Sequence, residues 1–247
     1  MRAVRDDIRF ALRRLRQQPG FTVVAVLTLA LGLGANTAIF TLLHAVMLRS
    51  LPVTRPTELY RLGDTFNCCV NSGLQTSYSL FSYPLFAHLR DELKEFDELA
   101  AFQATAPVTP LRPPTGPSVS VPATYVSGNY FRVMGVGAAT GRVLTPGDDV
   151  VGSPPVMVMS HRAFVEQFGG DASLIGQAFM INGVAVTLVG VTTPGFFGET
   201  IRPNPAGLWI PLGQEPVIRG AETSLVGRPA QDWLYAIGRV SSTPNLD

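Results

Sequence analysis

The chain has 247 residues, and its 19 lysines and arginines nearly balance 18 acidic side chains, leaving a formal net charge of +1. That length is enough to bury one large core or two small ones. The part beyond residue 48 carries no basic surface of the kind that nucleic acids require, so we expect no nucleic-acid partner.

Residues 1–20 form a basic head with a local charge of +4, because two aspartates stand against six arginines. Val4, Ile8, Leu12 and Leu15 recur at helical spacing, which predicts an amphipathic helix with a basic polar face. We interpret it as a cytoplasmic helix at the lipid headgroups. The alternative is an ordinary solvated helix that only supplies charge for orientation. The arginines are Arg2, Arg5, Arg9, Arg13, Arg14 and Arg16.

Residues 21–48 contain no Asp, Glu, Lys or Arg. As a helix they would reach about 42 Å, which exceeds the roughly 30 Å hydrocarbon core of a bilayer. Because the bilayer core offers no water, a helix that closes its own backbone hydrogen bonds is the expected form. The sequence therefore predicts a transmembrane helix over residues 21–48.

A cleaved signal peptide is the alternative interpretation of this N-terminus. Its apolar region should have about 7 to 15 residues and end at a small-residue cleavage site. The run here is much longer and is closed by no such site, which favours an uncleaved anchor. Since basic residues stay on the cytoplasmic side, the head is expected inside and the chain after about residue 49 outside.

Small residues mark one face of the expected span. Ala30, Gly34 and Ala38 recur at intervals of four, so a neighbouring helix could approach closely there. Asn36 is the polar residue deepest in the apolar run, and it either hydrogen-bonds a neighbouring helix or bonds back to its own backbone. We predict that Ala30, Gly34, Ala38 and Asn36 serve helix packing.

The region beyond the span, residues 49–247, reads as an α+β domain of mixed strands with a few helices. Residues 51–61 suggest an extended link, and residues 82–102 suggest a helix capped by Ser82, with an apolar stripe of Leu85, Leu89, Leu93, Phe96 and Leu99. His88 and the acidic residues Asp91, Glu92, Glu95, Asp97 and Glu98 lie off that stripe, as a solvated face would.

Further along, five prolines in residues 104–118 restrict that stretch to loop or edge structure. Asn182 and Gly183 are the strongest hairpin signal, because this pair suits a type I′ turn. One short helix is expected at residues 161–168. Strands are expected at residues 119–126, 155–160, 178–181, 184–191, 208–211 and 233–240.

No catalytic motif, cofactor loop or metal-ligand spacing appears, so we expect no enzyme, no cofactor and no metal site. Lys94 is the single lysine, which excludes a phosphate-binding loop of the Walker type in this chain. Cys68 and Cys69 are adjacent, which is too close for ordinary metal spacing, and their role is open. An anchored hydrolase assembled in space stays a third hypothesis, with His88 and His161 as its candidate bases.

Two blocks of sequence resemble MacB/FtsX-type ABC transporter permeases, most closely the duplicated permeases abundant in acidobacteria. Residues 7–52 resemble the first transmembrane region, with the sequence DIRFALRRLRQQPGFTVVAVLTLALGLGANTAIFTLLHAVMLRSLP. Residues 126–149, 154–196 and 207–212 resemble the MacB-like periplasmic core domain, with VSGNYFRVMGVGAATGRVLTPGDD, PPVMVMSHRAFVEQFGGDASLIGQAFMINGVAVTLVGVTTPGF and GLWIPL.

The resemblance implies an extracytoplasmic α+β domain of two subdomains, one inserted in the other, in the bacterial cytoplasmic membrane. It also implies a subunit without chemistry of its own, driven by a separate cytoplasmic ABC ATPase and paired with a second permease copy. Such a domain transmits ATPase-driven motion or binds substrate and partners for export.

The sequence departs from such permeases after residue 48, because no comparable charge-free apolar run follows. A complete permease would have at least three more spans. We therefore expect an N-terminal portion of a permease, with a core domain that is incomplete at its C-terminus. The alternative is a free-standing, membrane-anchored binding module of the cell envelope.

Overall fold

The computed structural model of the chain describes residues 13–47, 53–63, 80–199 and 202–240. The chain divides into two compact units, Met1–Ser50 and Leu51–Asp247. Residues 13–17 are helical, and the rest of the predicted amphipathic helix lies outside the described residues. Cys68 and Cys69 also lie outside them. The predictions for those segments stay predictions.

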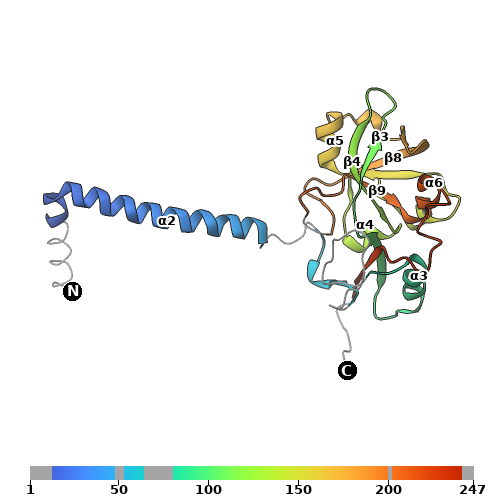
Figure 1. The fold of residues 1–247 in the computed structure, drawn as a ribbon, viewed down its shortest axis with the longest axis horizontal. Coiled ribbons are helices and arrows are strands. Elements are labelled where there is room, and N and C mark those ends of the chain that lie inside the picture. The colour runs from blue at the N-terminus through green and yellow to red at the C-terminus, as the bar shows by residue number, and fades with distance from the viewer. Residues whose placement is uncertain (1–12, 48–52, 64–79, 200–201, 241–247) are drawn as a thin grey trace. The chain divides into compact units, whose positions relative to one another are not determined.

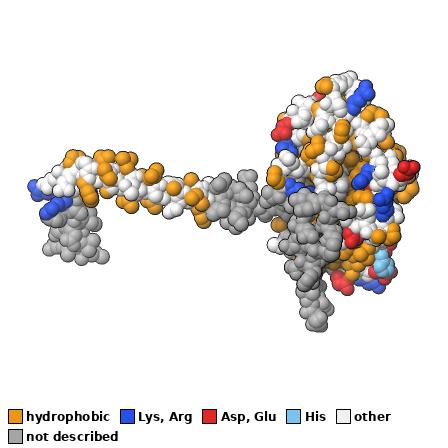
Figure 2. Space-filling view, in the orientation of Figure 1, with side chains coloured by type: hydrophobic (Ala, Val, Ile, Leu, Met, Phe, Trp, Pro, Cys, Tyr) orange, Lys and Arg blue, Asp and Glu red, His pale blue; other side chains and the backbone are white. Residues whose placement is uncertain are grey.

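Helix α2, Pro19–Met47, dominates the first unit. Its stretch Pro19–Thr41 contains an 18-residue window with a mean hydropathy of 2.0 and is long and apolar enough to cross a membrane. Hydrophobic side chains run along it (Figure 2). The hydroxyls of Thr28, Thr37 and Thr41 each donate to the carbonyl four residues earlier, at 2.7 to 2.8 Å, so these polar groups are satisfied within the helix.

The second unit combines strands with short helices (Figure 1). Its α-helices are α3 Tyr83–Glu92, α4 Tyr130–Met134, α5 His161–Phe168 and α6 Glu215–Arg219, and its 3-10 helices are η1 Pro56–Glu58, η2 Pro146–Asp149, η3 Ala172–Leu174 and η4 Leu212–Gln214. Its strands are β1 Leu59–Arg61, β2 Glu98–Gln103, β3 Val108–Leu111, β4 Val119–Val126, β5 Ala138–Gly141, β6 Val156–Met159, β7 Ala178–Ile181, β8 Val184–Thr192, β9 Leu208–Pro211 and β10 Leu234–Arg239.

The strands of the described residues form one mixed sheet in the order β1-β10-β2-β4-β9-β6-β8-β5, with β3 paired to β4 and β7 to β8. The pairs β4/β9 and β6/β8 are parallel, and the other pairs are antiparallel. Helices and strands do not alternate regularly along the chain. The expected α+β class is confirmed.

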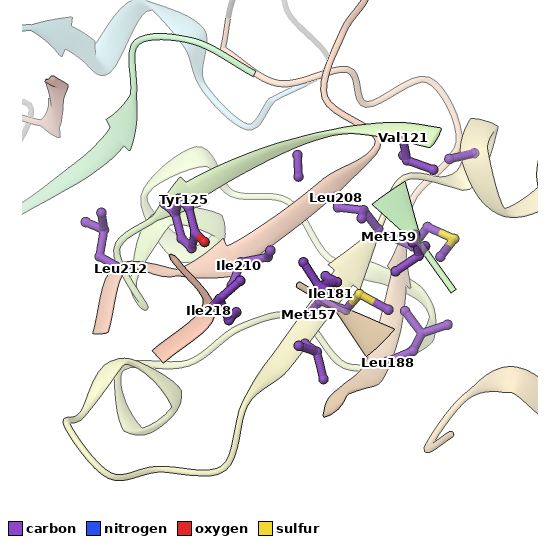
Figure 3. Close-up of a cluster of buried hydrophobic side chains, with 14 of the residues drawn as sticks. Val121, Tyr125, Met157, Met159, Ile181, Leu188, Leu208, Ile210, Leu212 and Ile218 are labelled. Atoms are coloured by element: carbon purple, nitrogen blue, oxygen red, sulfur yellow. The ribbon is translucent and has the colours of Figure 1, made fainter. Parts of the chain in front are cut away.

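The sheet is buried on both faces, because neighbouring residues of its central strands point to two different cores. Figure 3 shows part of the first core, to which α3, α5 and α6 contribute Phe86, Phe164 and Ile218. Helix α4 covers the second core. The resemblance implied two subdomains, whereas a single sheet here runs between the two cores. The first core includes Leu99, Ala101, Met157, Met159, Leu208 and Ile210, and the second includes Ala100, Phe102, Val156, Val158, Trp209 and Tyr235.

The hairpin prediction is confirmed. Strands β7 and β8 pair antiparallel on either side of Asn182 and Gly183. Their φ angles are 49° and 83°, as a type I′ turn requires at both central positions. Strand β3 is also consistent with the proline-rich composition of its region, since it pairs with β4 through Pro110 outside the main strand order.

The predicted helix over residues 82–102 is wrong in its second half. Helix α3 ends at Glu92, and Leu93 is already extended. Residues 98–103 form strand β2, which pairs along its whole length with β10. Both faces of this strand are buried, so residues 99–102 are all apolar and do not alternate with polar residues. Most of the predicted apolar stripe does pack in the first core, namely Leu89, Leu93, Phe96 and Leu99. Leu85 is the exception, because it is exposed and Phe86 is the buried residue of α3. Ser82 precedes the helix without a side-chain cap.

Gly190 allows the close crossing of β5 and β8. It lies opposite Gly141 on β5, and the register between β8 and β6 shifts at its position. A methyl group on Gly190 would overlap the backbone of Arg142 and Thr140. Neither contact is the end of a flexible side chain, so the strands themselves would have to separate.

We predict that Gly190→Ala destabilises the second unit, Leu51–Asp247, which we call the outer domain after its predicted location. The expected loss is about 2 to 3 kcal/mol, as overpacking of a dense interior costs. Urea unfolding of the full chain in detergent, followed by the fluorescence of the buried Trp209 and Trp233, measures this loss. Gly137→Ala is the matched control, because a methyl group there meets nothing within 4 Å. Equal stability of the two variants would contradict the tight crossing.

Candidate functional site

The segment that follows α2 is built into the sheet of the outer domain. Residues 51–61 were expected to be an extended link, but β1 within them pairs antiparallel with β10, and Leu59 lies opposite Arg239. Backbone bonds extend the pairing on both sides, from Leu62 to Ala236 at 3.0 Å and from Val240 to Glu58 at 3.1 Å. The incoming strand β1 and the outgoing strand β10 therefore lie side by side.

Arg239 holds this junction together. Its Nη2 donates to the carbonyls of Thr54 and Val133, both at 2.8 Å, and its Nη1 forms an ion pair with Glu58 at 3.1 Å. Its Nε also donates to Val133, at 3.2 Å. Only 12% of the side chain is exposed. The planar guanidinium offers five donors in a fixed fork, so one residue joins three separate segments of the chain.

The C-terminus of α4 forms the other half of the contact. Thr54 donates its hydroxyl to the carbonyl of Gly135 at 2.8 Å and its backbone N–H to Met134 at 3.3 Å. Gly135 ends α4 in the left-handed region, with φ 67°, and a Cβ there would lie 2.5 Å from the Thr54 Cβ. Glycine is therefore needed for both the turn and the close approach.

Helix α4 is itself fixed to the sheet. Tyr130 and Phe131 are fully buried in the second core. Asn129 donates to the carbonyl of Leu99 on β2 at 3.0 Å, and Arg132 forms an ion pair with Glu98 at 2.7 Å. A displacement of residues 53–58 thus reaches α4, β10 and β2 through direct contacts.

Arg61 adds an aromatic contact on the second-core side of β1. Its guanidinium lies 4.2 Å from the ring centre of Tyr235 on β10 and 4.9 Å from that of Phe102 on β2. A cation over an aromatic face is attracted by the ring quadrupole. Three neighbouring strands are therefore joined by side chains as well as by their backbone ladder.

A shallow cleft of about 190 Å³ lies at the junction between Arg55, Asp97, Arg132 and Arg239. The three arginines of the cleft are paired: Arg55 and Arg239 each form an ion pair with Glu58, and Arg132 forms one with Glu98. Among the described residues, no group of three or more His, Cys, Asp or Glu side chains is arranged to hold a metal ion. The arrangement ties residues 53–58 to β10 and α4 by direct contacts.

The sequence-predicted packing residues lie on α2. Ala30, Gly34, Ala38 and Asn36 are all exposed in the structure. At 100° per residue, Ala30, Gly34 and Ala38 share one face, while Asn36 lies about 200° around the helix from Gly34. The four residues thus belong to two sides of the helix.

The acidic residues of the α3 region divide into two groups. Asp91, Glu92 and Glu95 are exposed together with His88, as the solvated-face interpretation predicts. Glu98 instead pairs with Arg132 at the junction. Neither the His88 ring nor the His161 ring forms a hydrogen bond to a serine in the described part of the chain, so the serine–histidine pair of the third hypothesis is not seen there.

Sequence reasoning missed the residues that make the junction. Arg239 sits in an apolar C-terminal strand, and Thr54 in a proline-rich link, without any motif. The one available signal was Gly135, a glycine directly after the short segment 130–134 that forms α4. Gly135 belongs to the junction because it contacts Thr54, which lies far from it in the sequence.

Comparison with known proteins identifies the family of this chain. The sequence profile of the MacB-like periplasmic core domain matches residues 22–242, which includes α2 and nearly the whole outer domain. The chain belongs to the MacB-like periplasmic core domain family. This family consists of domains from ABC transporter permeases, as the resemblance in the sequence indicated.

Solved structures share the MacB-like fold at low identity. The periplasmic region of MacB from Actinobacillus actinomycetemcomitans has a TM-score of 0.52 and 17% identity, covering 76% of this chain and 75% of that one. The extracellular domain of the noncanonic ABC-type transporter YknZ from Gram-positive bacteria gives 0.50 and 15%, covering 75% and 83%.

A third similar structure is a domain of a putative permease protein from Porphyromonas gingivalis, with a TM-score of 0.51 and 14% identity over 69% of this chain and 72% of that one. No curated protein matches the sequence significantly. The likeness to the three solved structures establishes the fold of this MacB-like domain.

We predict that Arg239→Gln destabilises the MacB-like domain by roughly 2 to 3 kcal/mol, because Glu58 loses its buried partner and two carbonyls lose their donors. Hydrogen exchange should also speed up locally at residues 54–62. Arg162→Gln is the matched control, since its pair with Glu166 is 4.0 Å long and both side chains are about half exposed. Unchanged hydrogen exchange at residues 54–62 in Arg239→Gln would show that Arg239 does not hold the junction together.

Proposed function

We propose that this chain is the membrane-anchored part of an ABC transporter permease, and that its outer domain transmits ATPase-driven motion or binds substrate and partners for export. The junction carries the proposal: the segment after α2 is clamped by Arg239 to the strand by which the chain leaves the domain. The family match supports the transporter setting.

A rigid path from the junction into the domain supports transmission of motion. Strand β1 pairs with β10, and β10 pairs with β2 over six residues. Dense cores on both faces resist internal deformation, so a force applied at residues 53–58 moves the sheet as a body. The same path would carry a signal from a bound partner back toward the helix.

In this proposal the chain lies in the bacterial cytoplasmic membrane, with residues 1–20 inside, residues 21–48 across the bilayer and residues 49–247 outside. The +4 charge of the head supports that orientation. Lys94, the single lysine, lies outside any phosphate-binding motif, so ATP hydrolysis falls to a separate cytoplasmic ABC ATPase. No catalysis is assigned to the outer domain.

We further propose that α2 contacts two neighbours. The small face of Ala30, Gly34 and Ala38 suits close approach of a second permease copy or another span. Asn36 faces the other side, where a hydrogen bond to a different helix would be retained in the bilayer.

A free-standing, membrane-anchored interaction module is the second candidate function. The compact outer domain, with its own two-sided core, favours it. The reading frame of the natural gene past codon 247 separates the two: an in-frame continuation with three or more apolar spans supports the permease, and an immediate stop supports the module.

The orientation is tested by protease treatment of right-side-out spheroplasts that carry the chain with an N-terminal tag. We expect residues 53–240 to be digested while the tag stays protected, because the head is cytoplasmic. Protection of the outer domain in intact spheroplasts, with digestion only after lysis, would overturn both candidate functions.

For the small face, we predict that Gly34→Leu lowers self-association in bilayers at least several-fold, since four added heavy atoms separate the helix backbones. Energy transfer between labelled copies at varied lipid dilution measures it. Asn36→Leu serves as the control on the opposite side and should leave self-association through the Gly34 face intact. Loss of association in Asn36→Leu alone would assign the pairing to the other face.

A further inference from the structure

A pocket of about 200 Å³ opens beside the first core, away from the Arg239 junction. Ala123 on β4, Ile210 on β9, Ile181 on β7 and Ile218 on α6 give it an apolar lining. The tip of the β7/β8 hairpin reaches over it, where the Asn182 amide donates to the carbonyl of Ile218 at 3.3 Å. An apolar cavity of about 150 Å³ already accepts benzene, so this one holds a ring-sized group.

Tyr125 supplies a polar group that nothing in the described part of the protein satisfies. Only 8% of the residue is exposed, and its ring packs edge-on against Trp233. The side chain lines the pocket, and Figure 3 shows its hydroxyl directed toward Ile210 and Ile218. The hydroxyl forms no hydrogen bond with the described residues, and its oxygen is not among the fully enclosed polar atoms, so it is open to the pocket.

The other polar side chains of the pocket are already committed. Gln103 accepts the Tyr125 backbone N–H at 3.3 Å and donates to Thr105. Arg219 pairs with the fully buried Glu215 at 3.5 Å, and Glu215 also accepts from Ser224 and Leu225. The Tyr125 hydroxyl is therefore the donor that a ligand in this pocket would use.

The electrostatics disfavour an anionic ligand. Burial raises the pKa of the Tyr125 hydroxyl, so the group remains a protonated donor at neutral pH. The negative charge of Glu215 raises this pKa further, and Arg219 lowers it by less. Arg219 is the charged residue of the pocket lining, and its guanidinium is paired with Glu215, so the site favours a neutral acceptor over a carboxylate.

We propose that this pocket binds a small, neutral, largely apolar compound of about ring size, whose acceptor oxygen takes a hydrogen bond from the Tyr125 hydroxyl. The site goes beyond the proposed function. Its success or failure is independent of the permease assignment, because binding is measured without an ATPase or a transport step.

Isoleucine methyl groups report on the site directly. The full chain, labelled with ¹³C at isoleucine δ1 methyls and held in detergent, is titrated with acetophenone. We expect saturable shifts at Ile181, Ile210 and Ile218, and none at Ile237, which belongs to the second core. Absence of saturable shifts at the three pocket methyls would overturn the proposal.

Variants then test the hydroxyl. Tyr125→Phe should weaken acetophenone binding about fivefold, the value of one neutral hydrogen bond. Tyr60→Phe is the matched control, because Tyr60 lies exposed on β1, and it should bind as the native chain does. Comparing variants in one detergent holds partitioning of the probe constant. Equal affinity of Tyr125→Phe and the native chain would remove Tyr125 from the site.

Benzoate tests the charge. It has the same ring but carries a carboxylate, and we expect it to bind at least fivefold more weakly than acetophenone. Tighter binding of benzoate would overturn the neutral-ligand assignment and place the positive charge of Arg219 in control of the pocket.

Discussion

Burial of the sheet on both faces is the constraint on which the outer domain depends. Each central strand gives alternate residues to two different cores, as Leu208 and Ile210 do on one side and Trp209 on the other. No strand of this kind can slip by one residue without exchanging its two sets of side chains. Register is therefore fixed from both directions, and the packing on both faces makes the sheet stiff.

The junction between residues 53–58 and the domain depends on that stiff sheet. β1 is only three residues long, and a strand of that length adds little by backbone pairing alone. Arg239 supplements it with hydrogen bonds and an ion pair to Thr54 and Glu58, which precede the strand, and with hydrogen bonds to Val133 on α4. The short strand is thereby held to the stiff sheet by side-chain contacts as well as by its backbone ladder.

The sequence predicted those parts of the fold that depend on local chemistry. The apolar run predicted α2, and the Asn182 and Gly183 pair predicted the hairpin. The segment at residues 161–168, which two glycines follow, predicted α5. It failed where distant pairing overrides local pattern: residues 98–103 look helical in isolation but become a strand because β10 pairs with them. Arg239 could not be recognised for the same reason, since its partners Thr54 and Val133 lie more than a hundred residues earlier.

The adjacency of β1 and β10 also brings the two ends of a long segment together. Leu59 and Arg239 are direct partners in the ladder between these strands, so the ends of residues 59–239 lie beside each other. Segments whose ends lie close together are the ones that tolerate insertion into a host. The stretch between these two strands can therefore be lengthened or replaced without moving the residues that flank it.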